Sequence, residues 1–559
     1  MTIRPDFALE AFSDFPDDAL FAPEPVTAAH IDAMMRRLVE CGVRRISWEV
    51  YGDGHGGFLI PEHEPRFQNY ARTYHGLEQN PLKAAVQAAH RHGLEIYGYF
   101  KPYETGPAAA FPEGSYEAMV YGRLSQLGGR LTWIDPFVVD HPDLRIRRRT
   151  DDLPADIQHT PICSLALRKL NDAPTRITRE HLQIWVSDLN YRYRPLDVPF
   201  NLTETIKPCP RDVHDLFSEK LLARKGDPQR VLLLDGLNIR DRYVLVTTDF
   251  TEGPADFENT DTEMLSAFDA NGREITGVIA SGATIWSQDK IDFRNWGLMF
   301  DLGYGGQLMR MDDPNGSGQK GIVAFTRGRN EYLPGALCET EPRVQAFWMR
   351  CIDGILDSGV DGIDFREENH STHTNHPEEY GFNEVVLEKC RQRGQIDLQT
   401  IAEVRGNAYS EFLSRAKTAI NKRGKKMRIH FQIDWYRPEP PRHRRLAYPA
   451  NLNFQWQSWL DNGLTDEAVL RFFALPFDCI FNDPVARELI ERCQRKGIPL
   501  TVNRYVAHMK PGAAEEEFQR VRRDGRFAGF ILYETQNFLE LKTGGGCEIS
   551  RPEVSALKT

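Results

Sequence analysis

The sequence predicts an α/β fold, a (β/α)8 TIM barrel with a large β-rich insertion between strands two and three. Three observations support this. A helical pattern, a glycine and a short apolar strand recur in that order in both the first and the last part of the chain. Parallel strands joined by helices are the usual product of such alternation. No GxGxxG turn follows any of these strands, which disfavours the alternative, a doubly wound open sheet.

The repeating unit is clearest near the N-terminus. A predicted helix over Thr27–Cys41 is followed by Gly42 and the strand RRISWEV, and a second helix over Pro81–His92 is followed by Gly93 and LEIYGYF. The later predicted helices cover Val344–Leu356, Tyr409–Arg423, Asp466–Phe473, Ala486–Lys496 and Ala513–Arg523. The predicted strands centre on Ile46, Ile96, Val323, Ile363, Phe431, Ile480, Val502 and Ile531. Alternation of this length is typical of a closed barrel.

The middle of the chain lacks the helix-glycine-strand pattern and contains β-like runs instead. The runs HLQIWVSD, RVLLLDG and RYVLVTTDF are β-like, and Asn271-Gly272 between two alternating runs is a strong hairpin signal. We therefore expect residues 1–104 to hold strands one and two and residues 105–320 to form the insertion, with a sandwich-like core at about 175–288. Residues 321–540 would hold strands three to eight, and residues 541–559 a C-terminal tail.

Composition narrows the class of protein. The chain has 559 residues, more than a single core usually supports. Its net charge of −11 argues against a surface that binds nucleic acid. No apolar run is long enough for a membrane span, and no signal peptide is visible at the start. The nine cysteines are scattered singly, as in a reduced cytoplasmic protein. Dinucleotide and phosphate-loop motifs are absent, so no cofactor is expected.

Alternation along the predicted strands places polar side chains inside the barrel. Active sites of such barrels lie at the carboxyl ends of the strands. The inward-facing set predicted from parity is Ser47, Glu49, Tyr51, Tyr97, Tyr99, Lys101, Asp364, Arg366, His430, Gln432 and Asp434. Polar residues at the other strand ends are Arg327, Asn482, Asp483, Asn503, Arg504, Tyr505 and Glu534. Their convergence on one mouth predicts a polar, ligand-filled site.

The stretch DGIDFREENHSTHTNH, Asp361–His376, is the most polar of these strand ends. Two carboxylates across a bond are the minimum for glycoside hydrolysis. Asp364 with either Asp434 or Asp483 could supply that pair, and Glu368 is a further acid candidate. Substrate contacts are expected from the rim residues Asn369 and His370, and from Trp435 if its strand has ended there. Buried barrel carboxylates also often pair with arginine, so a structural role for Asp364 stays open.

The chain resembles glycoside-hydrolase-like barrel proteins, akin to family ten and to the α-amylase and α-galactosidase barrels. The resemblance rests on the helix-glycine-strand opening, the block ALCETEPRVQAFWMRCIDGILDSGVDGIDFREENHS and the closing FAGFILYE, and it covers about two-thirds of the chain. Family-ten enzymes carry glutamates after strands four and seven, whereas strand seven here ends NRY. An α-galactosidase-like arrangement implies Asp364 and Asp483 as the pair, and an amylase-like one implies Asp364 and Asp434.

Several cations share the predicted mouth. Lys101, Arg327, Arg329, Arg366 and Arg504 suit carboxylate or sulfate groups, so an acidic sugar such as a uronate, a sialic acid or a sulfated residue is the expected substrate. The insertion could form the contact between the two subunits of a homodimer.

Two other functions stay open. A metal-dependent isomerase, lyase or aldolase would use His370, His373 and His376 with Glu367, Glu368 and Glu378. A carbohydrate-binding protein without catalytic activity would still bind sugar after the substitution Asp364→Asn.

Overall fold

The computed structural model describes most of the chain. The described residues are 4, 6–49, 59–60, 65–103, 109–111, 129–131, 137, 141–152, 159–188, 194–214, 221–248, 265–275, 278–282, 322–327, 331–367, 377–437, 451–473, 475–507, 509–510 and 512–557. None of the described helices is long and apolar enough to cross a membrane.

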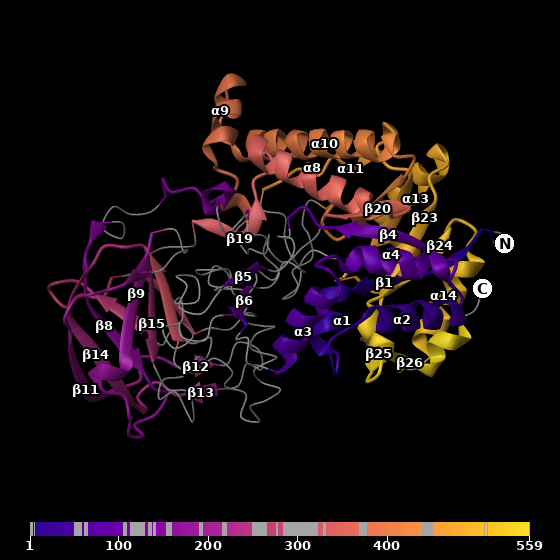
Figure 1. The fold of residues 1–559 in the computed structure, drawn as a ribbon. Helices are drawn as coiled ribbons and strands as arrows, with labels where there is room; N and C mark the ends of the chain where they lie inside the picture. The colour runs from indigo at the N-terminus through magenta and orange to yellow at the C-terminus, as the bar shows by residue number, and fades with distance from the viewer. Residues whose placement is uncertain are drawn as a thin grey trace.

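Eight parallel strands close into a barrel, which confirms the predicted fold class (Figure 1). Their order around the barrel follows the chain: β1 (Ala8–Asp14), β2 (Val43–Glu49), β4 (Glu95–Phe100), β20 (Gly362–Arg366), β21 (Lys426–Gln432), β22 (Glu467–Arg471), β23 (Leu500–Tyr505) and β24 (Gly529–Tyr533). β1 pairs with both β2 and β24, so the first and last strands close the barrel.

Helices of the barrel alternate with these strands. They are α2 (Ala28–Glu40), α4 (Pro81–Arg91), α8 (Pro342–Asp357), α10 (Leu398–Lys422), α11 (Trp456–Asp461), α13 (Pro484–Lys496) and α14 (Ala513–Arg523). Shorter or additional helices are α1 (Phe15–Phe21), α3 (Pro65–Gly76), α9 (Glu384–Gln392) and α12 (Cys479–Asn482). Their apolar faces and the outward side chains of the strands make one continuous core.

The first barrel strand, β1, is one that the sequence pattern did not predict. In ALEAFSD, Glu10, Phe12 and Asp14 alternate with Leu9 and Ala11, but no helix-glycine unit precedes them. Because β1 comes first, the strands near Ile46 and Ile96 are the second and third, and the insertion leaves the barrel after the third strand instead of the second.

The strand around Val323 was wrongly predicted as a barrel strand. β18 (Ile322–Arg327) pairs antiparallel with β15 (Tyr243–Thr248) and β17 (Val278–Gly282) in a separate sheet. A short apolar run fits a buried strand of either kind, so the composition of GIVAFTR could not distinguish them.

The sixth barrel strand was also wrongly placed. The run FDCIFND forms the helix α12 and the cap of α13, whereas EAVLR, expected within a helix, is the strand β22. The helix-glycine-strand unit is in fact present here, as α11, Gly463 and β22. Gly463 has a φ of 67°, a conformation that favours glycine after a helix.

The insertion contains two antiparallel sheets that face each other. One has the order β11-β14-β8-β16 and the other β10-β9-β15-β18-β17. Their bounds are β8 (Ile162–Arg168), β9 (Leu182–Ser187), β10 (Arg194–Pro195), β11 (Asn201–Pro208), β14 (Pro228–Ile239) and β16 (Leu265–Phe268). Apolar residues from both sheets form a second, separate core. Figure 1 shows these strands gathered apart from the barrel.

Candidate active site at the carboxyl ends of the barrel strands

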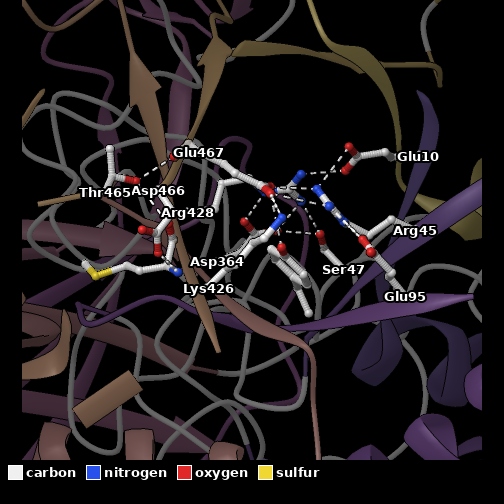
Figure 2. Close-up of polar contacts among 12 residues, drawn as sticks. Glu10, Arg45, Ser47, Glu95, Asp364, Lys426, Arg428, Thr465, Asp466 and Glu467 are labelled. Atoms are coloured by element: carbon white, nitrogen blue, oxygen red, sulfur yellow. Dashed lines mark hydrogen bonds and ion pairs between the residues drawn. The ribbon is translucent and has the colours of Figure 1, made fainter. Parts of the chain in front are cut away.

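Asp364, the first choice from the sequence, lies fully buried in the middle of β20 (Figure 2). Arg428 binds both its carboxylate oxygens, with Nη2 2.6 Å from Oδ2, and the Ser47 hydroxyl donates to the same Oδ2. Burial acts to raise the pKa of Asp364, but the Arg428 guanidinium outweighs it and holds that pKa well below its usual range. Asp364 is therefore an ionised partner of Arg428.

The Asp364–Arg428 pair belongs to a larger network, the base network, formed by Glu10, Arg45, Ser47, Asp364, Arg428 and Glu467. Arg428 Nη1 lies 2.5 Å from Glu10 Oε2, and Arg45 Nη1 lies 2.7 Å from Glu467 Oε2. Glu10, Arg45, Asp364 and Arg428 are each the third residue of their strands, and Glu467 is the first of its strand. The network thus lies toward the amino ends, where barrel residues usually serve stability.

An apolar layer lies above the base network, toward the carboxyl ends of the strands. It consists of Phe12, Tyr99, Val469, Ile531 and Tyr533, with Tyr505 packed against it. The Phe12 and Tyr533 rings stack at 4.3 Å, and Tyr99 meets Phe12 edge-on at 4.5 Å. His430 connects this layer to the base network, because its Nε2 lies 3.5 Å from Asp364 Oδ2 and its ring meets Tyr99 edge-on at 5.1 Å.

Above this layer, the strand ends bring together a second set of charged residues, the mouth cluster. It consists of Asp14, Glu49, Lys101, Arg366, Arg471 and Glu534. Lys101 Nζ lies 2.7 Å from Glu49 Oε1, and both side chains are buried. Arg366 Nη1 donates to the Tyr533 hydroxyl at 2.9 Å, and the Arg471 guanidinium lies 4.5 Å from the centre of the Tyr533 ring.

Glu534 is a carboxyl group of the mouth cluster whose pKa is strongly shifted. It is half-buried and directly follows β24. Burial, and after it the charge of Asp14, raise the pKa of Glu534 to about 7, although Lys101, Arg366 and Arg471 act to lower it. Near neutral pH, Glu534 can therefore hold a proton beside a second carboxyl group, the arrangement that acid–base chemistry requires.

Other predicted site residues lie close to the mouth cluster. Asp434 is buried just beyond β21, where its Oδ2 accepts from Gln432 Nε2 and from the Phe473 backbone N–H at 2.8 Å. Asn503 is buried and belongs to the inward parity of β23. Tyr505 contacts Tyr533, with ring centres 5.7 Å apart.

Four predicted site residues are placed away from the mouth. Arg504 points outward, where its Nε and Nη2 bind Glu517 of α14 at 2.6 and 2.9 Å. Trp435 stacks on Phe454, a residue of the outer core. Asn482 ends α12, and Asp483 caps α13 by accepting from the Val485 and Ala486 backbone N–H groups at 2.9 and 3.1 Å. Asp483 is therefore not at the end of a barrel strand, contrary to the prediction.

Arg327 is likewise not at the mouth, because β18 belongs to the insertion. Its guanidinium donates to the carbonyl oxygens of Thr160 and Ile239, both at 2.6 Å, and of Asp241 at 3.1 Å. These contacts give Arg327 a structural role in the sandwich. The predicted residues Arg329, Glu368, Asn369 and His370 lie outside the described residues.

Asp14 and Arg471 are site residues that the sequence pattern missed. Each ends a barrel strand that was not recognised, β1 and β22 respectively. Period-two alternation in ALEAFSD, and the glycine after α11, were the signals that could have found them.

Glu367 is a further buried acid at the end of β20. It follows Arg366, but it has the opposite parity and accepts a hydrogen bond from the Tyr436 hydroxyl. Burial raises the pKa of Glu367 to about 8, although Tyr436 acts to lower it. This carboxyl therefore lies on the helix side of the strand, and not in the mouth cluster.

No protein-family model matches the chain, and no curated protein matches it in sequence. Several solved structures of sugar-acting enzymes are similar to it in backbone. The catalytic domain of a β-amylase from Paenibacillus polymyxa is 8% identical, with a TM-score of 0.35 over 99% of this chain and 97% of that one. A GH20 exo-β-N-acetylglucosaminidase from Vibrio harveyi is 7% identical, with a TM-score of 0.36 over 100% of this chain and 54% of that one.

The glycoside hydrolase domain of PelA from Pseudomonas aeruginosa is 10% identical, with a TM-score of 0.22 over 37% of this chain and 65% of that one. At identities this low, the function has to be inferred from the chain's own side chains.

Proposed function

We propose that the protein is a glycoside hydrolase that cleaves a bond to an acidic sugar at the mouth of the barrel. The observation that carries the proposal is the coupling of Asp14 and Glu534, two carboxyl groups at the ends of neighbouring strands. Hydrolysis of a glycoside requires one carboxylic acid to protonate the leaving oxygen and one carboxylate to act as nucleophile or as base for water.

Glu534 is the proposed proton donor. A pKa of about 7 leaves a substantial fraction of this carboxyl protonated at neutral pH, and its side chain is only partly buried, which allows contact with substrate. As the bond between the anomeric carbon and the glycosidic oxygen breaks, the Glu534 proton moves to that oxygen and the leaving group departs as an alcohol. Asp14 is the proposed ionised partner, which attacks the anomeric carbon or takes a proton from water.

The cations of the mouth cluster favour a negatively charged substrate. With Glu534 protonated, and with Asp14 and Glu49 counted as ionised, three cations in the described part of the mouth face two carboxylates. The excess positive charge can be balanced by a carboxylate or sulfate of the substrate, and the forked guanidinium groups of Arg366 and Arg471 suit such groups. A uronic acid is the simplest sugar of this kind.

The test is a panel of 4-nitrophenyl glycosides, both anomers of glucuronide, galacturonide and sulfated sugars, with the neutral glucosides as controls. We expect turnover of an acidic glycoside that falls at least about 100-fold in Glu534→Gln and in Asp14→Asn. Glu517→Gln is the matched control, because this carboxylate binds Arg504 outside the barrel.

Absence of turnover across the panel would contradict the proposal, and saturable sugar binding without turnover would favour a binding protein. Turnover that is lost on chelation and restored by a divalent metal would favour metal-dependent chemistry.

A further inference from the structure

Asp18 connects the two strand ends that carry the proposed acid and its partner. This aspartate lies in α1 and is buried. Its Oδ2 accepts two hydrogen bonds, from Ser13 Oγ at 2.7 Å and from Thr535 Oγ1 at 2.9 Å. Ser13 directly precedes Asp14, and Thr535 directly follows Glu534.

All three members of this bridge are shielded from water. Ser13 and Thr535 are fully buried, and Asp18 is 6% exposed. In such surroundings a hydrogen bond that is left unmade is costly. The bridge therefore fixes the spacing of the two strand ends more tightly than the β1–β24 ladder alone, whose last paired residues are Phe12 and Tyr533.

We infer that Asp18 is a positioning residue that holds Asp14 and Glu534 at the spacing needed for acid–base chemistry. The inference rests on the proposed function, because it assigns Asp18 a role in the same reaction. Asp18 itself touches neither the substrate side of the mouth nor the proposed reacting atoms, and it acts through Ser13 and Thr535.

The electrostatic surroundings of Asp18 agree with this role. Burial, helped by the charge of Asp14, raises the pKa of Asp18 to about 7, although the hydrogen bonds from the Ser13 and Thr535 hydroxyls act to lower it. A further titratable group on which Asp18 acts is the Cys547 thiol, whose own pKa is raised to about 12, mainly by burial. The charge of Asp14 thus acts on two carboxyl groups, Asp18 and Glu534, and a change in its position alters the proton affinity of both.

The experiment compares variants that cut the bridge with one that preserves it. Thr535→Val and Asp18→Ala remove a donor and the acceptor, whereas Asp18→Asn keeps an oxygen that can accept both hydrogen bonds. The matched control is Thr465→Val, because the buried Thr465 hydroxyl donates to the Met427 and Glu467 carbonyl oxygens at the opposite end of the barrel, at 3.2 and 2.5 Å.

With an acidic aryl glycoside, we expect kcat to fall about tenfold in Thr535→Val and Asp18→Ala, with KM nearly unchanged. Asp18→Asn should recover most of the loss, and Thr465→Val should behave as the unaltered protein. A Thr535→Val variant with unaltered kcat, or an equal loss in Thr465→Val, would overturn the inference. Ser13→Ala replaces Asp18→Ala if the latter does not fold.

A second readout needs no substrate. The infrared carbonyl band of protonated carboxyl groups is followed against pH, and Glu534→Gln assigns the part that belongs to Glu534. Cutting the bridge lets Asp14 and Glu534 separate, so the Glu534 midpoint should move to more acidic pH in Thr535→Val and stay in place in Thr465→Val. If no glycoside is hydrolysed but this shift occurs, the positioning role of Asp18 is supported and the proposed function is contradicted. If the Glu534 midpoint does not move in Thr535→Val, the positioning role of Asp18 is contradicted.

Discussion

Asp14 ends the first strand of the barrel, Glu534 follows the eighth, and the charge of Asp14 helps to raise the pKa of Glu534 to about 7. The two strands pair in parallel, so this coupling is a direct product of barrel closure. It makes the protonation of Glu534 the property on which activity should depend.

The pH dependence of activity follows from that protonation. Because the proton donor works only while protonated, kcat should fall as the pH rises through about 7, the pKa of Glu534. The measurement is kcat for an acidic aryl glycoside across the neutral range. Glu534→Gln should lose most of its activity, and its residual kcat should no longer fall as the pH rises through this range. If the residual kcat of that variant still falls as in the unaltered protein, the fall belongs to another group.

The mouth cations should set the preference for charged sugars. Arg471→Met removes a guanidinium next to Tyr533 and should raise KM for an acidic glycoside about tenfold or more, while KM for its neutral analogue changes little. Arg504→Met is the matched control, because Arg504 lies next to the last residue of the neighbouring strand but binds Glu517 on the helix side. Equal effects of the two variants on KM would remove the mouth cations from substrate recognition.

Arg428 should matter for stability more than for chemistry. Arg428→Met leaves the buried carboxylates Asp364 and Glu10 without their shared partner, so the free energy of unfolding should fall by about 3–5 kcal/mol. Urea denaturation measures this, with Arg423→Met as the control, because its exposed pair with Asp357 should contribute less than about 1 kcal/mol. A stable Arg428→Met protein would remove the stabilising role assigned to the base network.

Glu367 should make stability depend on pH. Its pKa is raised to about 8 in the folded protein, so the folded state keeps a proton that the unfolded chain releases above its ordinary pKa of about 4.3. The stability that this proton contributes is complete below about pH 4.3 and is lost as the pH rises through about 8. Denaturation at several pH values in this window should therefore show a shallower decline in Glu367→Gln. A decline as steep as in the unaltered protein would mean that Glu367 is already ionised when folded.

The sequence predicted the barrel and the inward face of its strands, but not how far along the barrel axis each inward side chain lies. Alternation correctly placed Asp364 inside, yet period two carries no information on the distance from the end of a strand. Asp364 is the third residue of β20 and so meets Arg428, whereas Arg366, two residues on, reaches the mouth. Arg428 comes from the neighbouring strand β21, a pairing that alternation within one strand cannot indicate.

The remaining errors arose from strands that lack a local signature. EAVLR consists of good helix formers, and the pairing that makes it a strand comes from β21 and β23. Arg504 was predicted at the mouth because it lies at a strand end, although its parity directs it outward to Glu517. Asp14 was missed because no helix-glycine unit precedes β1, although ALEAFSD alternates with period two.

The most direct test of the central claim compares leaving groups. A proton donor matters most when the leaving group is a poor one, so Glu534→Gln should reduce kcat/KM strongly for an alkyl or 4-nitrophenyl glycoside. The reduction should be small for the 2,4-dinitrophenyl glycoside of the same acidic sugar, whose leaving group needs no proton. An equal loss for both leaving groups, or no loss for either, would contradict the assignment of Glu534 as the acid.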